Sequence, residues 1–569
     1  LSAEQMLKAW QKLKRNVRSL HERIFFRPLL AAVSTLSRDE VALSDQAAQD
    51  RLAALGYRDP RGAMRHIEAL TNGVSRRAEI QRHLMPVLLG WFAEGVDADA
   101  GLLGFRLVSE SLGTTSWYLR MLRDSPAAAE RLCQILSSSR YITDLLEDAP
   151  TSITWLDKVA DLQPLSVGAL KAEITSLLSR HEDSADAMRA VRYLRRREIL
   201  RIAMGDALNL LSVQQVCTGL ATVDERTIGA ALALAEREEV KAGERDEETA
   251  PQKSDAPQHD SQEAAGKKSS EDEQQNPLLT EITVIAMGRL GGAENGFGSD
   301  ADVMFVHRPV KGADEKEAQA QANRVVNRLM QLIKQPVRPA IRAERPLEVD
   351  ADLRPEGKQG ALVRSLDSYR AYYERWAETW EFQALLRARP IAGSEDLGRA
   401  FVELIDPYRY PREFTVEQAQ QVRRMKARVE HERMPHGADR TRQLKLGRGG
   451  LSDVEWLVQL IQLQHAHKVE GLRTTSTLEA LEAAVQANLV AAEDAEVLRD
   501  AWLLATKIRG GNVLRGVRQS DLLPTLRDAL EAVARWSGYT PGSARQLEED
   551  YLRVTRNARK VYERLFFEG

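Results

Sequence analysis

The sequence predicts an α+β protein that is predominantly α-helical, with a small mixed β-sheet flanked by helical bundles. Over long stretches, apolar residues recur at three- and four-residue spacing, which is typical of amphipathic helices. Two apolar runs of buried-strand length, at residues 282–287 and 303–306, interrupt this pattern and enclose a glycine-rich turn. We therefore expect a strand–turn–strand unit at the centre of a mainly helical chain.

The composition excludes several classes of protein. The formal net charge is −3 with 29% charged residues, so nothing indicates an obligatory nucleic-acid partner. No apolar run has the length of a membrane span, and no signal peptide opens the chain. The two cysteines, Cys133 and Cys217, lie far apart and show no zinc-site spacing. We expect a reduced, cytoplasmic protein that binds neither nucleic acid nor a membrane.

The two ends of the chain resemble each other. Six of eleven positions are identical between Asn16–Phe26 and Asn557–Phe567. A segment that closes one module and also opens the chain indicates a tandem duplication, although two amphipathic helices can also agree by chance. The chain begins with Leu1 rather than methionine, so we interpret it as a fragment in which residues 1–36 form the helical tail of a preceding module.

The rest of the chain divides into three predicted regions. We expect a helical lead-in or regulatory region at residues 37–184, a domain with the strands at 185–400, and a C-terminal helical bundle at 401–569. Residues 241–276 contain no Val, Ile, Leu, Met, Phe, Trp or Tyr. Such a segment cannot bury enough apolar surface to offset its loss of conformational entropy. We therefore predict that it is a disordered insertion in a surface loop.

The strand–turn–strand unit carries the candidate site. The turn contains Gly291 and Gly292, where side chains would obstruct a close approach, and the second strand opens with Asp300 and Asp302. Because side chains alternate along a strand, these two carboxylates share one face at a separation of about 7 Å. They repel each other unless a cation lies between them, and Ser299 adds a hydroxyl that can reach a phosphate. This arrangement indicates Mg²⁺ and a phosphate-bearing substrate. The structural alternative is a turn-rich hairpin with solvated aspartates.

A third strand is predicted before Asp350, because Leu347 and Val349 alternate there. It places Asp350 at its exposed end, and Asp352 follows two residues later, so either carboxylate can complete the site. Arg354 would lie on the same face if the strand continued, which makes it a candidate for a phosphate contact. A salt bridge that holds the acidic cluster together explains Arg354 equally well.

Several motifs are recognisable. The run GRLGGAENGFGSDADVMF, residues 288–305, resembles the G-[KR]-x-G-G-x-E-x-x-x-x-S-D-x-D signature of glutamine synthetase adenylyltransferases, which are polymerase-beta-like nucleotidyltransferases. Pro346–Gly357 resembles the family pattern V-D-x-x-L-R-P-x-G, and Leu444–Trp456 resembles K-x-x-x-G-G-[LI]-x-D-[IV]-E-[FW]. Trp380–Arg389 resembles the W-E-x-Q-A-L-x-R-A-R run in the transferring half of the family, from which the duplicated removing half differs.

The resemblance implies roles for further residues. It makes residues 185–400 a nucleotidyltransferase catalytic domain with Asp350 as the third metal-site carboxylate, although Asp352 stands where a basic residue is expected. Lys445 and Arg448 would reach the β- and γ-phosphates across the cleft. The predicted site thus comprises the catalytic and metal-binding carboxylates Asp300, Asp302 and Asp350 and the nucleotide-binding residues Gly291, Gly292, Ser299, Arg354, Lys445 and Arg448.

The resemblance also implies the reaction. AMP would pass from ATP to a tyrosine hydroxyl of glutamine synthetase, with release of pyrophosphate, in an in-line displacement assisted by two Mg²⁺ ions. Full-length family members pair this activity with a phosphorolytic removing half, and they respond to glutamine and to PII-type signalling proteins. Glutamine synthetase is therefore the expected partner, and a PII-type protein and glutamine are possible effectors.

Three alternatives are less well supported. Removal of AMP from adenylylated glutamine synthetase is disfavoured by the Trp380–Arg389 run. A non-catalytic, nucleotide-binding regulatory module has no need of the paired carboxylates. A template-independent RNA nucleotidyltransferase would be expected to carry a basic groove, which the near-neutral net charge does not indicate.

Overall fold

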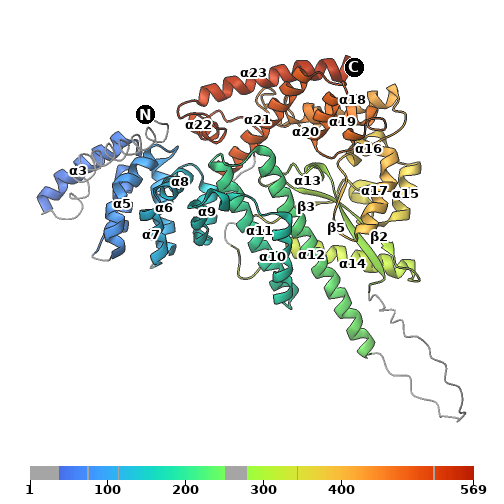
Figure 1. The fold of residues 1–569 in the computed structure, drawn as a ribbon, viewed down its shortest axis with the longest axis horizontal. Helices are drawn as coiled ribbons and strands as arrows, with labels where there is room; N and C mark the ends of the chain where they lie inside the picture. The colour runs from blue at the N-terminus through green and yellow to red at the C-terminus, as the bar shows by residue number, and fades with distance from the viewer. Residues whose placement is uncertain are drawn as a thin grey trace, which may run out of the picture.

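The protein is described by a computed structural model. The described residues are 38–73, 76–112, 115–249, 278–341, 344–516 and 520–568. The helical tail predicted at residues 1–36, and residues 250–276 of the predicted disordered insertion, lie outside these ranges. None of the helices in the described ranges is long and apolar enough to cross a membrane. The predicted fold class is confirmed, because many helices surround one small mixed sheet (Figure 1).

The N-terminal part of the described chain is entirely helical. Its helices pack around one apolar core, in which Phe92 and Phe105 meet with ring centroids 5.9 Å apart. Short 3₁₀ helices lead from these helices toward the sheet. The elements are α3 (Arg38–Leu55), α4 (Pro60–Thr71), α5 (Arg76–Ala93), α6 (Ala98–Leu112), α7 (Ser116–Asp124), α8 (Pro126–Leu136), α9 (Arg140–Asp148), η2 (Pro150–Leu156), η3 (Val159–Leu162) and α10 (Val167–Arg180).

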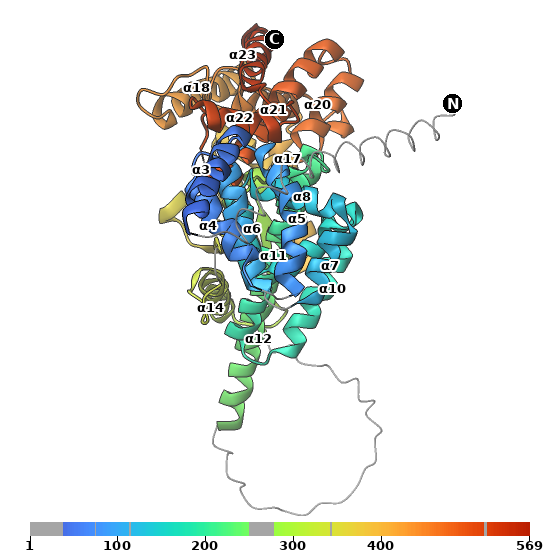
Figure 2. The ribbon, with the colours of Figure 1, turned by 90° about the vertical axis from the view of Figure 1, so that its left-hand side faces the viewer.

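Two long helices, α11 (Ser184–Ala207) and α12 (Val213–Thr249), join the N-terminal helices to the sheet. Helix α12 projects beyond the rest of the molecule (Figures 1 and 2) and includes residues 241–249, the first part of the segment predicted to be disordered. That prediction was wrong for these nine residues. Glutamate, lysine and arginine are good helix formers, so a polar stretch can prolong an existing helix without burying apolar surface.

The sheet has the order β3-β2-β1-β5, and β4 also pairs with β2. Strand β1 is antiparallel to β2 and β5, whereas β3 and β4 run parallel to β2. The strand–turn–strand unit and the third strand predicted from the sequence are therefore confirmed. The strands are β1 (Thr280–Ala286), β2 (Ala301–Pro309), β3 (Val349–Asp350), β4 (Val363–Ser365) and β5 (Arg389–Gly393).

Both faces of the sheet are buried. Val284 and Phe305 face the core that α12 and α14 (Glu315–Lys334) share with the N-terminal helices, whereas Ile285 and Met304 face a second core under α15 and α17. The second core belongs to α15 (Leu366–Arg375), α16 (Thr379–Leu385) and α17 (Glu395–Arg409). Because α17 packs on the sheet, the boundary predicted after residue 400 falls inside this helix, and the C-terminal bundle begins after residue 409.

The C-terminal bundle has its own apolar core and lies above the sheet in Figure 1 and above the N-terminal helices in Figure 2. The N-terminal helices also contact it: Ser139 donates a hydrogen bond to the Leu514 carbonyl at 2.7 Å. The bundle comprises α18 (Val416–Arg433), α19 (Leu451–His465), η5 (Glu470–Leu472), α20 (Thr477–Gln486), α21 (Ala492–Gly516), α22 (Arg527–Trp536), α23 (Ala544–Glu563) and a closing π-helical turn, Arg564–Glu568.

A buried carboxylate connects three helices of this bundle. Asp453 of α19 binds Lys426 of α18 at 2.7 Å and Arg559 of α23 at 2.9 Å, and it accepts the Gly449 N–H at 2.7 Å. The side chains of Lys426 and Asp453 are 3% and 1% exposed. Removing one partner of such a pair leaves an uncompensated buried charge.

We expect Asp453→Ala to destabilise the bundle by about 3 kcal/mol, because both cations lose their shared partner. Thermal unfolding of the purified chain should show a clear drop in Tm. The matched control is Asp396→Ala, which removes the exposed partner of Arg399 on α17 and should leave Tm nearly unchanged. Equal Tm values for the two variants would contradict the structural role assigned to Asp453.

Candidate active site

The glycine turn is a single helical turn, α13 (Gly288–Gly291), directly between β1 and the segment that leads to β2. Its first residue, Gly288, has a φ of +52°, and a Cβ there would overlap the Asp302 carboxylate. The Met287 N–H donates to the Asp302 carbonyl at 2.8 Å. The absence of a side chain at Gly288 therefore allows the backbone to lie against the second aspartate of the D-x-D motif.

Two of the predicted carboxylates are register partners. Strand β3 pairs in parallel with β2 so that Asp350 lies beside Asp302, and neighbouring strands are about 4.8 Å apart. Asp300 precedes β2 by one residue and is exposed, whereas Asp302 and Asp350 are half-buried. Burial, together with the charges of Asp350 and Asp300, raises the pKa of Asp302 to about 6. The structure thus brings all three predicted carboxylates within electrostatic range of one another.

This arrangement suits a divalent cation, but the described side chains do not form a complete set of metal ligands. In the described part of the chain, no three acidic, histidine or cysteine side chains are close enough to form a ready metal cluster. The charge repulsion at Asp302 is nevertheless what a divalent ion would relieve, and carboxylate oxygens are the ligands that Mg²⁺ prefers. The donor set therefore fits a divalent metal ion.

Asp350 and Asp352 have different surroundings in the loop that follows β3. The Asp350 carboxylate accepts the Asp352 N–H at 2.7 Å and remains beside Asp302. Asp352 instead faces its own loop, where Lys358 lies 3.2 Å away and Arg354 lies 3.7 Å away. The geometry favours Asp350 as the third carboxylate.

Arg354 is occupied by the same loop. Its guanidinium donates to the carbonyls of Ala351 at 2.8 Å, Gly360 at 3.1 Å and Lys358 at 3.2 Å. With its donors directed at three carbonyls, Arg354 holds the loop that follows Asp350. The structure therefore supports the alternative in which Arg354 stabilises the acidic segment, and direct phosphate contact by Arg354 remains an untested prediction.

The other turn residues also have structural partners. A Cβ at Gly291 would overlap the Arg387 carbonyl oxygen, and a Cβ at Gly292 would overlap the Arg387 guanidinium. The Ser299 hydroxyl accepts the Gly296 N–H at 2.9 Å and is half-buried. Packing alone thus explains why Gly291 and Gly292 carry no side chains, and their predicted nucleotide contacts remain predictions.

Cations from the C-terminal bundle face the carboxylates. The charges of Lys445 and Arg433 oppose the rise in the pKa of Asp302, so both lie within electrostatic range of it. Lys445 was expected there, but Arg433, the last residue of α18, was not. Arg448 is exposed in the same loop as Lys445, and its backbone N–H donates to the Arg440 carbonyl at 3.2 Å. Charges from the sheet edge and from the bundle therefore act together at Asp302.

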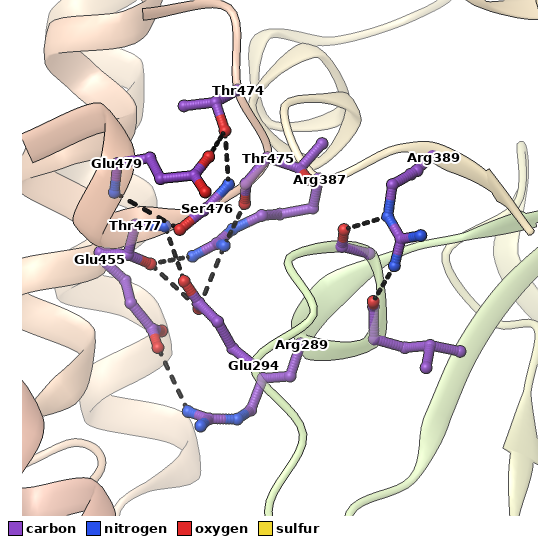
Figure 3. A network of polar contacts seen from close by, with 12 residues as sticks. Arg289, Glu294, Arg387, Arg389, Glu455, Thr474, Thr475, Ser476, Thr477 and Glu479 are labelled. Atoms are coloured by element: carbon purple, nitrogen blue, oxygen red, sulfur yellow. Dashed lines mark hydrogen bonds and ion pairs between the residues drawn. The ribbon is translucent and has the colours of Figure 1, made fainter. Parts of the chain in front are cut away.

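A polar network ties the turn to the bundle (Figure 3). Glu294 accepts hydrogen bonds from the Thr477 N–H at 2.6 Å and the Thr477 hydroxyl at 3.0 Å, and it pairs with Arg387 at 3.1 Å. Arg389 donates to the Gly291 carbonyl at 3.0 Å. The sequence did not identify these supporting roles. The only local signal was the position of both arginines in the Trp380–Arg389 run.

Comparisons with known proteins agree with the motifs. The family model for glutamate-ammonia ligase adenylyltransferase matches residues 129–259 and 255–404, and that for GlnD PII-uridylyltransferase matches residues 423–566. The chain is 46% identical over 572 residues to a bifunctional glutamine synthetase adenylyltransferase/adenylyl-removing enzyme of Leifsonia xyli, which covers 100% of this chain and 52% of the relative.

Two further relatives carry the same description. The one from Streptomyces avermitilis is 46% identical over 563 residues, covering 98% of this chain and 54% of the relative. The one from Mycobacterium tuberculosis is 42% identical over 564 residues, covering 97% and 53%. The chain thus spans about half the length of the curated relatives it matches.

The raised pKa of Asp302 has a consequence for stability. The ordinary pKa of an aspartate is 3.8, and that of Asp302 is about 6. The folded protein therefore binds this proton more tightly than the unfolded chain does. The resulting stabilisation is complete below pH 3.8 and is lost as the pH rises through 6. At pH 7.5 the ionised carboxylate lowers the stability of the metal-free fold by about 1–3 kcal/mol.

We expect Asp302→Asn to raise the Tm of the protein in EDTA at pH 7.5, because it removes this repulsion. The gain should shrink at pH 5, where the carboxyl is already largely protonated. Asp352→Asn is the matched control and should produce no such gain, because Lys358 lies beside its carboxylate. Thermal unfolding at the two pH values measures the difference, and a gain that did not depend on pH would contradict the assigned repulsion.

Proposed function

Because this chain belongs to the glutamate-ammonia ligase adenylyltransferase family, we propose that it transfers AMP from ATP to a tyrosine hydroxyl of glutamine synthetase and releases pyrophosphate. The observation that supports this reaction most directly is the pairing of Asp302 with Asp350 opposite Lys445 and Arg433. Carboxylates at the sheet edge, with Lys445 and Arg433 of the bundle within electrostatic range as a cationic wall, suit a metal-bound triphosphate. The relatives are named as bifunctional enzymes that both transfer and remove the adenylyl group of glutamine synthetase.

In this proposal Asp300, Asp302 and Asp350 hold Mg²⁺. When bound, the metal ions stabilise charge on the attacking and leaving oxygens during an in-line displacement at phosphorus. Asp350 is kept in place by the Asp352 N–H, and Asp302 by the backbone of α13. The chain thus presents the carboxylates from two paired strands, which are more rigid supports than loops.

The chain's own groups then bind and orient the nucleotide. Lys445 and Arg433 offset negative charge on the phosphates next to Asp302. Arg448, which is exposed in the same loop as Lys445, is a further proposed phosphate contact. The Ser299 hydroxyl, fixed by the Gly296 N–H, can donate its proton to a phosphate oxygen. The acceptor hydroxyl is supplied by the protein substrate.

The direction of the reaction is proposed from the Trp380–Arg389 run. Arg387 and Arg389 of this run lie directly against the glycine turn. Since the run resembles that of the transferring half, we favour transfer over removal. A regulatory module without turnover is disfavoured, because a non-catalytic site would not need a pair of carboxylates that lowers the stability of the fold.

Partners and location follow from the family and the composition. Glutamine synthetase is the target implied by the names of the relatives. The match of residues 423–566 to a PII-uridylyltransferase model supports a link to PII signalling. A PII-type protein and glutamine remain predicted effectors, and a cytoplasmic location remains predicted from the composition.

The test is incubation of the chain with Mg²⁺, α-labelled ATP and purified glutamine synthetase. We expect label on glutamine synthetase, and we expect Asp300→Asn and Asp302→Asn to reduce its appearance by at least about 100-fold, because each removes a metal ligand. Asp352→Asn is the matched control and should keep most of the activity. Near-normal transfer by Asp302→Asn would mean that the carboxylates are not the site.

The same preparation distinguishes transfer from removal. If no label is transferred, adenylylated glutamine synthetase and phosphate are supplied instead. Release of ADP would assign the chain to phosphorolytic removal. Absence of both reactions, with nucleotide binding retained, would favour the regulatory alternative.

A further inference from the structure

Two of the polar contacts between the catalytic domain and the C-terminal bundle differ in how fully they are satisfied (Figure 3). In the first, Glu294 receives two hydrogen bonds from Thr477 and pairs with Arg387. Arg387 in turn donates to the carbonyl of Thr475 and to the hydroxyl of Thr477. This contact is dense and buried, so it is a fixed junction.

The second contact is looser. Arg289 of α13 reaches Glu455 of α19 at 3.4 Å, and its guanidinium carbon lies 5.9 Å from the centre of the Trp502 ring. The side chains of Arg289 and Glu455 are 17% and 18% exposed. Among the described residues, Nε and Nη2 of Arg289 find no hydrogen-bond partner. Its charge is therefore balanced by one long ion pair, unlike the charge of Arg387.

The looser contact connects the segment that lies against Asp302 with the segment that carries Lys445. On one side, Arg289 follows Gly288, whose backbone lies against the Asp302 carboxylate. On the other side, Glu455 lies on α19, whose first turn is joined to Lys445 by the hydrogen bond from the Ser452 N–H at 2.9 Å. A shift of Arg289 relative to Glu455 would therefore shift the carboxylates relative to the cationic wall.

Glu455 also balances a second cation nearby. Burial and the charge of Arg289 lower the pKa of Arg509, and the charge of Glu455 acts in the opposite direction. Arg509 is itself paired with Asp521 at 2.6 Å. Without the Glu455 carboxylate, the repulsion between the two guanidinium groups would be less well balanced, and within the described ranges Arg289 has no other ion pair to hold it.

We propose that Arg289 and Glu455 are positioning residues that set the distance between the catalytic carboxylates and Lys445 by clamping the glycine turn to the C-terminal bundle. The expected effect on turnover rests on the proposed function. The expected effect on the position of the bundle relative to the catalytic domain rests on geometry alone. Neither side chain takes part in the reaction. The pair acts by aligning the groups that do, and misalignment of about 1 Å can reduce turnover by up to 100-fold.

The kinetic test compares Arg289→Met, Glu455→Gln and the double variant with the wild-type chain. We expect each single change to lower kcat by about 10-fold with less than a twofold change in the KM for ATP. The double variant should be no slower than either single variant, because each single change already breaks the same Arg289–Glu455 interaction. Arg289→Lys, which keeps the charge, should recover part of kcat. The matched control is Arg324→Met, which breaks the pair of Arg324 with Glu239 away from the cleft and should leave kcat unchanged.

A second measurement does not depend on activity. Lys311 of the catalytic domain and Glu493 of the bundle are exposed, and both native cysteines are buried. Spin labels at Lys311→Cys and Glu493→Cys report the distance between the two parts by pulsed electron resonance. We expect Glu455→Gln to broaden or shift this distance distribution and Arg324→Met to leave it unchanged.

The outcomes separate the proposal from the reaction on which it rests. A changed distance distribution in a chain that transfers no AMP would support the clamp while overturning the proposed function. An unchanged distribution with unchanged kcat would overturn the clamp. A lower Tm with unchanged kcat would also overturn it, because the pair would then only stabilise the fold.

Discussion

The candidate site depends on one constraint, the parallel pairing that sets Asp302 beside Asp350. A slip of one residue in this pairing would turn Asp350 to the opposite face of the sheet and separate the two carboxylates. Strand β3 contains only two residues, so its own backbone bonds hold the register weakly. The register is supported by the Ala301 N–H, which donates to the Glu348 carbonyl at 2.8 Å, and by the loop that Arg354 holds through three carbonyls.

The surrounding structure makes this unfavourable pairing possible. Strands β1 and β2 are buried on both faces, so the edge that carries the carboxylates cannot relax without disturbing two apolar cores. Gly288 brings backbone against Asp302, and the charges of Lys445 and Arg433 partly offset the repulsion there. The packing of the two apolar cores thus keeps the repelling carboxylates close together. Functional sites commonly retain such local strain because the rest of the fold is stable enough to support it.

The sequence predicted the parts of the fold that depend on local pattern. Apolar runs of strand length identified β1 and β2, and the D-x-D spacing identified Asp300 and Asp302 as candidates without any structural information. Asp350 required both a strand pattern and a family motif, and only the hydrogen bonds of its loop separated it from Asp352. Residues 241–249 were predicted to be disordered but belong to α12, because composition does not show where a helix supported by tertiary packing stops.

Residues that meet across the fold could not be predicted from local pattern. Arg433 ends a helix with no motif, and its approach to Asp302 follows from how the bundle docks. The pairing of Glu294 with Arg387 likewise joins segments that are distant in sequence. The boundary after residue 400 was misplaced for the same reason, since only the contact of α17 with the sheet shows to which core that helix belongs.

The shared chemistry of transfer and removal explains why the carboxylates alone cannot fix the direction of the reaction. Both reactions displace an oxygen in line at the phosphorus of AMP, and both need the same negative edge and cationic wall. In transfer the wall must hold pyrophosphate as it leaves, whereas in removal it must hold phosphate as it attacks. In the proposed function the direction rests instead on the Trp380–Arg389 run, whose Arg387 joins the glycine turn to Thr475 and Thr477 of the bundle. The interface between the two parts therefore belongs to that proposal as much as the carboxylate motif does.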